Sequence, residues 1–283
     1  MIAITGATGQ LGQLVIQHLL NKTTADQIIA LVRSPEKADD LKKLGIEIRQ
    51  ADYTKPETFT TALQGVKKLL LISSSEVGQR VQQHQNVIDA AKNAGVELLA
   101  YTSILKADSS PLALAAEHIA TETAIKASGV PYVMLRNSWY TENYLLSIAP
   151  SLAHGAFIGC AGEGKISSAS RSDYAEAAAV VLTSQEDQNG KTYELAGDEP
   201  YTLAQLCEVI SAESGKTIPY VNMAEADFAK ALEGAGLPAP FAAMLADSDT
   251  GASQDGLFDD SHTLSTLIGH PTQPLQQMVK AFL

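Results

Sequence analysis

The feature that most constrains this chain is a glycine triplet close to its amino terminus, within the sequence MIAITGATGQLG. Residues 2–4 form a short apolar run that is typical of a buried strand, and Gly6, Gly9 and Gly12 follow at three-residue spacing. Beyond Gln10 the apolar residues recur at helical spacing, which predicts a helix that begins there. A strand, a glycine turn and a helix in this order favour a loop that binds the diphosphate of a dinucleotide.

Each of the three glycines has a separate predicted task. Gly6 permits the tight turn, Gly9 lets the backbone approach the phosphates without a Cβ, and Gly12 lets the helix pack closely on the strand. The diphosphate is expected against the unpaired N–H groups at the positive end of the helix. The alternative is a glycine turn in a flavodoxin-like sheet that binds no cofactor.

Length and composition exclude several classes of protein. The 283 residues suffice for one large domain, or for a dinucleotide domain with a smaller lobe, and 45% of them are hydrophobic. No apolar run of about 18 residues predicts a membrane span, and no basic region or cleavage site predicts a signal peptide. The net charge of −12, without a long basic run, argues against nucleic-acid binding.

The cysteines and histidines indicate neither disulfides nor metal binding. Cys160 and Cys207 are too few for a disulfide framework and too isolated for a zinc site, and the histidines show no metal-ligand spacing. No metal is therefore expected, and a reducing cytoplasm is the simplest location.

The first half of the chain alternates between strand and helix patterns, which predicts an α/β fold of the Rossmann type with a doubly wound parallel sheet. The predicted strands cover residues 2–4, 27–32, 46–49, 68–72, 97–102 and 132–135. The predicted helices between them begin at residue 10 and cover residues 35–44, 58–63, around 81–91 and 111–128.

Beyond residue 137 the alternation breaks, so we divide the chain into an NAD(P)-binding core at residues 1–136 and a remainder at 137–283. The remainder is expected to be mostly a smaller α/β substrate-binding lobe, with segments that return to the core. Its predicted helices cover residues 139–153, 173–183, 202–214 and 226–235, and its predicted strands cover 192–195 and 218–221. The polar, glycine-containing segment 247–260 is expected to be a loop, either a mobile lid or an ordinary surface loop.

The residue at the end of the second strand indicates which dinucleotide is preferred. NAD-preferring Rossmann units place an acidic residue there, to accept the adenosine ribose hydroxyls. This chain has Arg33, whose guanidinium can bind a 2′-phosphate and stack on adenine. NADPH is therefore favoured over NADH. The alternative is a surface arginine that pairs with Glu36 or another nearby carboxylate.

Three serines, Ser73, Ser74 and Ser75, end the fourth predicted strand. In a doubly wound sheet the loops after the first and fourth strands flank the point where the strand order reverses. We therefore expect these serines over the diphosphate and the nicotinamide ribose.

Several segments together resemble one family: GATGQLG, LVR, Asp52–Tyr53, LLLISSSEVGQR, AYTS and LRNSWYTENY. They are similar to the atypical short-chain dehydrogenases/reductases of the NmrA-like group, and within it to bacterial quinone-reducing members. The related triphenylmethane dye reductases share the opening and the LRN segment. The resemblance runs over essentially the whole chain, including the ending SHTLSTLIGHPTQPL.

The resemblance implies an extended Rossmann fold, NADPH as the hydride donor and a small-molecule quinone as the acceptor. It also implies cofactor contacts from Gly6, Ala7, Thr8, Gly9, Gln10, Leu11, Arg33, Ser73, Ser74, Ser75, Asn137 and Arg171.

The usual proton relay of short-chain dehydrogenases is absent. Its tyrosine and lysine lie four residues apart on the helix after the fifth strand, where this chain has His118 and Glu122. A carboxylate favours the protonated form of its neighbour and cannot replace the lysine. The catalytic residue is therefore unknown; His118 and Tyr101, on the fifth strand, are the candidates. The alternative for His118 is a structural hydrogen bond to Glu122.

A quinone accepts hydride readily and forms a stabilised anion that water can protonate, so loss of the relay matters little for it. Stacking and alignment in an apolar pocket with a few polar anchors are then the main requirements. Trp139, Tyr140 and Asn143 follow the sixth strand and are the candidate substrate contacts. Their alternative role is packing.

The leading hypothesis is therefore NADPH-dependent quinone reduction by direct hydride transfer without flavin, in a monomer or a homodimer. One alternative is an NADP(H)-binding redox-sensing regulator without catalysis. Another is a reductase of a different conjugated electrophile, such as a triphenylmethane dye. The physiological quinone is not indicated by the sequence.

Overall fold

The computed structural model describes residues 1–283, which form two compact units. The first unit consists of Met1–Ile104, Ala116–Asn137 and Arg171–Tyr193. The second consists of Leu105–Ala115, Ser138–Ser170 and Glu194–Leu283. In place of one boundary after residue 136, the chain therefore enters the second unit early, at residues 105–115, and returns to the first at 171–193.

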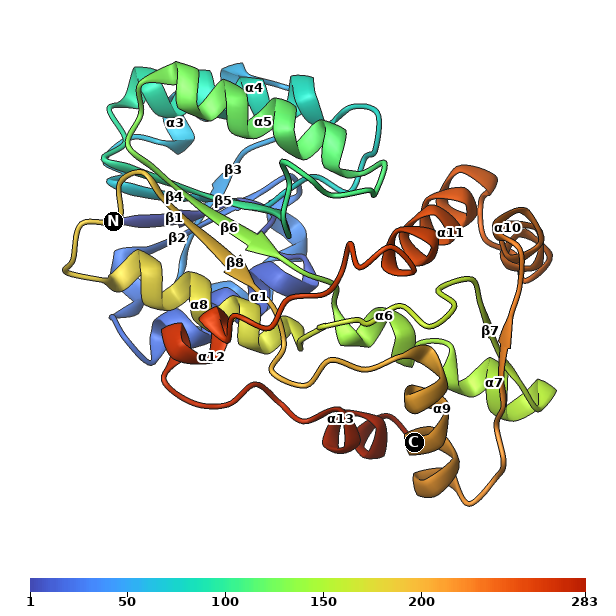
Figure 1. The fold of residues 1–283 in the computed structure, drawn as a ribbon. Coiled ribbons are helices and arrows are strands. Elements are labelled where there is room, and N and C mark those ends of the chain that lie inside the picture. The colour runs from blue at the N-terminus through green and yellow to red at the C-terminus, as the bar shows by residue number, and fades with distance from the viewer. The chain divides into compact units, whose positions relative to one another are not determined.

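A seven-stranded sheet forms the centre of the first unit, with the strand order β3-β2-β1-β4-β5-β6-β8 (Figure 1). The pairings from β3 through β6 are all parallel, which confirms the doubly wound sheet and the six strands predicted from the first half. The strands are β1 (Ile2–Ile4), β2 (Ile28–Val32), β3 (Glu47–Gln50), β4 (Lys68–Leu71), β5 (Leu98–Ile104), β6 (Tyr132–Asn137) and β8 (Lys191–Leu195).

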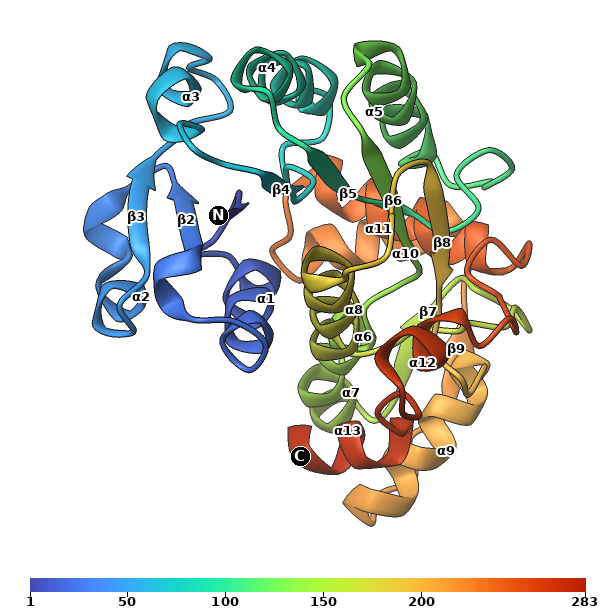
Figure 2. The same cartoon turned by 90° about the vertical axis from the view of Figure 1, so that its left-hand side faces the viewer.

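Helices cover both faces of this sheet, as Figure 2 shows, with α1, α2 and α8 on one face and α3, α4 and α5 on the other. A buried apolar cluster that includes Leu69, Val87 and Tyr101 joins the second group to the sheet. The helices are α1 (Gln10–Leu20), α2 (Asp39–Lys43), α3 (Glu57–Ala62), α4 (Arg80–Ala94), α5 (Ala115–Ser128) and α8 (Arg171–Thr183).

Two predicted helices differ from those observed. The helix predicted over residues 139–153 is divided into α6 (Thr141–Leu145) and α7 (Ile148–His154). Pro150 accounts for the break, because it has no N–H and its ring clashes with the carbonyl four residues earlier in a continuous helix. The helix predicted over 35–44 is a 3₁₀ turn, Pro35–Lys37, followed by α2.

The second unit holds a two-stranded parallel sheet and mostly helices. The sheet pairs β7 (Phe157–Gly159) with β9 (Tyr220–Asn222). The remaining helices are α9 (Leu203–Ser214), α10 (Glu225–Gly234), α11 (Ala239–Ala252), α12 (Thr263–Ile268) and α13 (Leu275–Phe282).

The loop predicted over residues 247–260 is wrong in its first part, because residues 247–252 are the last turns of α11. Polar residues there make hydrogen bonds inside the unit. Asp247 accepts a hydrogen bond from the Ala113 N–H at 2.8 Å, and Asp249 is buried. Gly251 lies so close to Leu112 that an added Cβ would come within 2.6 Å of it.

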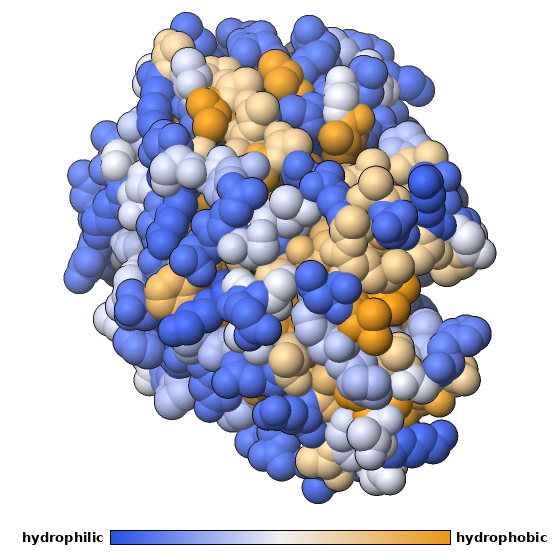
Figure 3. Space-filling view, turned by 45° about the vertical axis from the view of Figure 1, so that its right-hand side comes forward, coloured by the Kyte–Doolittle hydropathy of each residue, from blue (hydrophilic) through white to orange (hydrophobic).

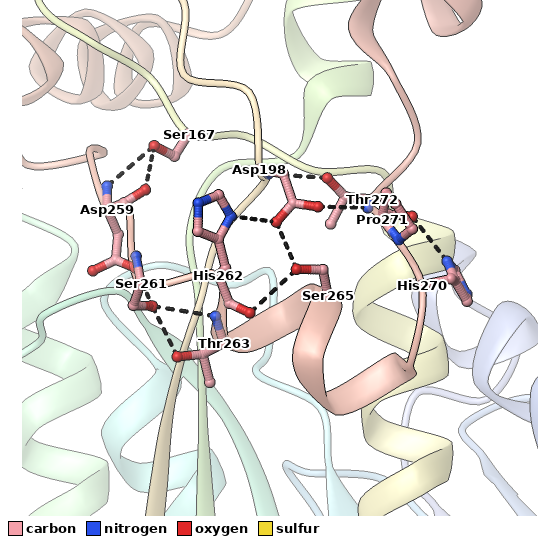
Figure 4. A network of polar contacts seen from close by, with 10 residues as sticks. All are labelled: Ser167, Asp198, Asp259, Ser261, His262, Thr263, Ser265, His270, Pro271 and Thr272. Carbon is pink, nitrogen blue, oxygen red and sulfur yellow. Dashed lines mark hydrogen bonds and ion pairs between the residues drawn. The ribbon is translucent and has the colours of Figure 1, made fainter.

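The segment around α12 is held in place by side-chain hydrogen bonds (Figure 4). One carboxylate, Asp198, accepts from His262 Nδ1 at 2.8 Å, from Ser265 Oγ at 2.7 Å and from the Thr272 N–H at 2.9 Å. Burial opposes ionisation of Asp198, but these hydrogen bonds outweigh it and lower the pKa of the carboxyl group. An ionised Asp198 thus connects both ends of α12 to the chain that follows β8.

The face in Figure 3 is mostly hydrophilic, with small apolar patches between the polar residues. No helix in the structure is long and apolar enough to cross a membrane.

A buried ion pair connects α5 with β6 in the first unit. Arg136 donates from Nε to Glu122 Oε1 at 2.9 Å and from Nη2 to Oε2 at 2.7 Å, and Ser103 Oγ donates to Oε1 at 2.6 Å. The side chains of Glu122 and Arg136 are only 2% and 7% exposed. Lys126 lies 3.6 Å from the same carboxylate but is largely exposed.

We expect Glu122→Gln to lower the free energy of unfolding by about 3–5 kcal/mol, because it removes the buried carboxylate charge that Arg136 contacts through two nitrogens. Lys126→Gln removes the exposed partner of the same carboxylate and should cost less than about 1 kcal/mol. Urea unfolding of both variants measures the difference. Equal, small decreases in the free energy of unfolding of the two variants would show that the buried ion pair does not stabilise the fold.

Candidate functional site

The first unit carries a pocket of about 380 Å³ at the carboxyl ends of its central strands. The loops after β1, β2, β3 and β4 supply the lining, which places the pocket where a doubly wound sheet binds its ligand. Of the residues predicted to bind a cofactor, those that line this pocket are Gly6, Thr8, Gly9, Gln10, Leu11, Arg33, Ser73, Ser74 and Ser75.

The glycine loop has a conformation that side chains would prevent. Gly6 adopts the left-handed region at φ +58°, and Gly9 donates from its N–H to Gly6 O at 2.9 Å. A Cβ added at Gly12 would lie 2.4 Å from Gly6 O and 2.8 Å from Ala7 Cα. The tight turn and the close packing assigned to Gly6 and Gly12 thus agree with the structure.

The first turn of α1 faces the pocket with its backbone. Gly9 is the N-cap and supplies no side-chain cap, and the first turn contains no acidic residue. The initial N–H groups of a helix carry partial positive charge and bind phosphate when no side chain covers them. This cradle of backbone fits a dinucleotide diphosphate.

Arg33 extends from the end of β2 at the rim of the pocket, with its side chain 71% exposed. Its guanidinium lies 3.6 Å from Glu76, which follows the serine loop. The structure thus pairs Arg33 with another nearby carboxylate, Glu76, as the alternative for this arginine allowed, and not with Glu36. Asp52, which also lines the pocket, experiences the charge of Arg33.

The serine loop after β4 is fixed through its backbone. The Ser73 N–H donates to Thr102 Oγ1 at 2.8 Å, and the Ser74 N–H donates to His84 Nε2 at 2.9 Å. Arg80 Nε donates to Ser74 O at 2.5 Å. Side chains from α4 and β5 therefore hold this wall of the pocket in place.

His84 is fully buried and its second nitrogen, Nδ1, lies 2.9 Å from Thr121 Oγ1. Because the Thr121 hydroxyl donates to Glu117 O, it accepts from Nδ1, which leaves Nε2 as the acceptor for the Ser74 N–H. Burial lowers the pKa of His84 to about 4, and the charge of Arg80 acts in the same direction. His84 is therefore neutral at neutral pH.

The two candidate catalytic residues are paired with each other inside the first unit. Tyr101 OH lies 2.8 Å from His118 Nδ1, and neither residue lines the pocket. Burial raises the pKa of Tyr101 and lowers that of His118 to about 3, so both are neutral. The alternative of a structural hydrogen bond from His118 to Glu122 is not what the structure shows, because Glu122 binds Arg136 and Ser103 and His118 pairs with Tyr101.

Tyr53 is a pocket residue to which sequence reasoning gave no role. Its hydroxyl lies 2.7 Å from both Thr5 Oγ1 and Ile72 O, so it joins the loops after β3, β1 and β4. A tyrosine in the turn after the third strand was the available signal. Gln83, also missed, lines the pocket with a buried Oε1 that has no hydrogen-bond partner.

The other three residues predicted at the cofactor are Ala7, inside the glycine loop, and Asn137 and Arg171, at the ends of other elements of the first unit. Ala7 is fully buried, Asn137 ends β6 and Arg171 begins α8, and none of them lines the pocket. The Oδ1 of Asn137 is a buried acceptor without a partner.

The predicted substrate residues belong to the second unit. Trp139, Tyr140 and Asn143 are half-buried around the start of α6. The next aromatic residue, Tyr144, is buried and donates from its hydroxyl to Asp249 at 3.0 Å. Burial raises the pKa of Asp249 to about 6, and no cation is paired with it.

The Asp198, His262 and Ser265 cluster of the second unit does not have the geometry of a hydrolase triad. Ser265 Oγ donates to Asp198 rather than to His262, so no base activates the hydroxyl. The pocket of the first unit remains the better candidate site.

Known proteins match the whole chain. The NmrA-like family model matches residues 1–270. Quinone oxidoreductase 2 of Escherichia coli is 60% identical over 279 residues, which cover 99% of this chain and 97% of that protein.

Solved structures agree with this similarity. The crystal structure of an NADPH-dependent quinone oxidoreductase from E. coli, complexed with NADPH, superposes with a TM-score of 0.97 at 60% identity, covering 99% of each chain. That of a triphenylmethane reductase from Citrobacter sp., complexed with NADP(H), gives 0.95 at 41% identity and covers all of both chains.

The buried His84 predicts a specific pH dependence of stability. Its pKa is near 6.5 in the unfolded chain and about 4 in the folded chain, so between these values the unfolded chain binds more protons. The contribution of His84 is therefore complete above pH 6.5 and is lost as the pH falls toward 4, by up to about 3 kcal/mol.

Urea unfolding between pH 7.5 and 4.5 should show a shallower decline for His84→Gln, which keeps an acceptor for the Ser74 N–H but does not titrate. His154→Gln, at an exposed position of α7, is the control and should leave the decline unchanged. Parallel curves for wild type and His84→Gln would contradict the assignment.

Proposed function

The chain belongs to the NmrA-like family, and we propose that it reduces quinones with NADPH by direct hydride transfer, without a flavin. The observation that carries the proposal is the 60% identity to an NADPH-dependent quinone oxidoreductase over nearly the full chain, together with an arginine at the adenosine end of the pocket. We also propose membership of the short-chain dehydrogenase/reductase superfamily.

NADPH, when bound, supplies the hydride. The backbone between Gly6 and Leu11 would hold its diphosphate, because Gly6 and Gly9 present no Cβ there and no side-chain cap covers the start of the helix. Arg33 would bind the 2′-phosphate through charge-assisted hydrogen bonds. The loop from Ser73 to Ser75 would contact the diphosphate and the nicotinamide ribose. We retain Ala7, Asn137 and Arg171 as proposed contacts from the family resemblance.

The structure supports a reaction that needs no proton relay. Glu122, at the position of the relay lysine, accepts two hydrogen bonds from the Arg136 guanidinium. Tyr101 and His118 are buried and contact each other. A quinone that accepts a hydride becomes a hydroquinone anion, and this anion takes its proton from water. The chain then has only to bind and align the two reactants.

The acceptor is a small-molecule quinone, and we propose that Trp139, Tyr140 and Asn143 contact it. The two aromatic rings would supply an apolar surface and the amide a hydrogen bond to a quinone oxygen. A cytoplasmic location is also proposed; Cys160 and Cys207 are buried free thiols, as is common in reducing compartments.

The proposed activity is tested with purified protein, NADPH and a panel of quinones, by following absorbance at the nicotinamide band. Turnover without added flavin is the expected result. Tight NADPH binding with no turnover on any quinone, dye or enone would instead indicate a redox-sensing regulator.

Arg33→Ala should raise the Michaelis constant for NADPH by about tenfold or more, since a charge-assisted contact to phosphate contributes about 1.5–3 kcal/mol. The constant for NADH should change little, because NADH has no 2′-phosphate. Steady-state kinetics with both cofactors at a saturating quinone concentration provides the measurement. Equal effects on the two cofactors would remove Arg33 from the 2′-phosphate site.

A further inference from the structure

Glu76 places a carboxylate where it opposes the recognition of NADPH. Its Oε1 lies 3.6 Å from Arg33 Nη1, and both residues line the pocket. The guanidinium proposed to bind the 2′-phosphate therefore already has an anionic partner in this structure.

Neighbouring residues hold the Glu76 carboxylate in this position. The carboxylate Oε2 accepts a hydrogen bond from Gln83 Nε2 at 2.7 Å. The backbone N–H of Glu76 donates to Ser74 Oγ at 3.1 Å. Gln83 is buried, so its amide is a fixed donor. Since Ser74 is itself fixed by His84 and Arg80, Glu76 lies on a rigid part of the loop.

Negative side chains outnumber positive ones among the residues that line the adenosine end of the pocket, which disfavours binding of a phosphate. Among the residues that line the pocket, Arg33 is the one positive group, and Asp52 and Glu76 are the two negative groups; Lys55 lies outside the lining, and its charge acts on Asp52. Asp52 has a structural task, since its Oδ1 accepts from the Thr54 N–H at 2.9 Å and from its hydroxyl at 2.8 Å. The Glu76 side chain makes no comparable hydrogen bonds to the backbone of its own turn. Its charge can therefore be removed by substitution while the loop keeps its conformation.

We propose that Glu76 is a specificity-determining residue that lowers the preference for NADPH over NADH, by competing with the 2′-phosphate for Arg33. The inference rests on the proposed function, since it requires that the pocket binds these dinucleotides. A 2′-phosphate must displace or share the contact with Glu76, whereas the ribose hydroxyl of NADH carries no charge that Glu76 repels.

The test is Glu76→Gln, which removes the charge but can still accept a hydrogen bond from Gln83. Isothermal titration calorimetry with adenosine 2′,5′-bisphosphate and AMP isolates the adenosine end of the site, and titration with NADPH and NADH extends the measurement to the cofactors. We expect about three- to tenfold tighter binding of the two 2′-phosphorylated ligands and little change for the other two.

Glu36→Gln is the matched control, because Glu36 is exposed three residues after Arg33 but makes no ion pair with it. It removes the same charge from the protein and should leave all four affinities nearly unchanged. The gain from Glu76→Gln should also shrink at high salt, since added ions screen exposed charges.

Three results would overturn the inference. Unchanged selectivity in Glu76→Gln would show that the carboxylate does not act on the 2′-phosphate, and an equal loss for all four ligands would show that it only supports the loop. Equal gains in Glu36→Gln and Glu76→Gln would show an effect of net charge alone. If wild type binds neither NADPH nor NADH, the proposed function fails as well; normal binding with unchanged selectivity overturns this inference alone.

Discussion

The close approach of the Gly12 backbone to the Gly6 carbonyl is the constraint on which the first unit depends. An added Cβ would lie 2.4 Å from that oxygen, well inside van der Waals contact. Because the turn and the helix touch through backbone alone, α1 begins directly after the glycine turn, with no side-chain cap on its first N–H groups. The same contact that lets the helix pack on the sheet thus creates the cradle for an anion.

The opposite wall of the pocket reaches a comparable rigidity by other means. The serine loop after β4, residues 73–75, contains no glycine, and the Ser74 peptide is fixed by His84 on one side and Arg80 on the other. A histidine suits this task because, when neutral, it accepts and donates at once. The arrangement requires His84 to stay uncharged, which burial ensures by lowering its pKa to about 4.

Local patterns predicted the parts of the structure that are determined locally. The six strands, the glycine loop and the place of Arg33 follow from residues adjacent in sequence. The ion-pair partners of Arg33 and Glu122 could not be predicted in this way. Glu76 and Arg136 are distant from them in sequence and come into contact with them only in the folded chain. Residues 247–252 were missed for a related reason: their polar side chains bond inside the fold, whereas polarity in sequence suggests solvent exposure.

In an acidic chain, the few charged residues around the pocket have a large effect on which dinucleotide binds. A protein of net charge −12 repels a cofactor that carries three phosphates, yet charges beyond about 8–10 Å are largely screened at physiological salt. If Arg33 binds the 2′-phosphate as proposed, we expect the local charge to come mainly from Arg33, Asp52 and Glu76, which are the charged residues that line the pocket, with Arg33 and Glu76 3.6 Å apart. Selectivity between the two dinucleotides can then change through one side chain while the glycine loop, which we propose holds the diphosphate common to both, stays as it is.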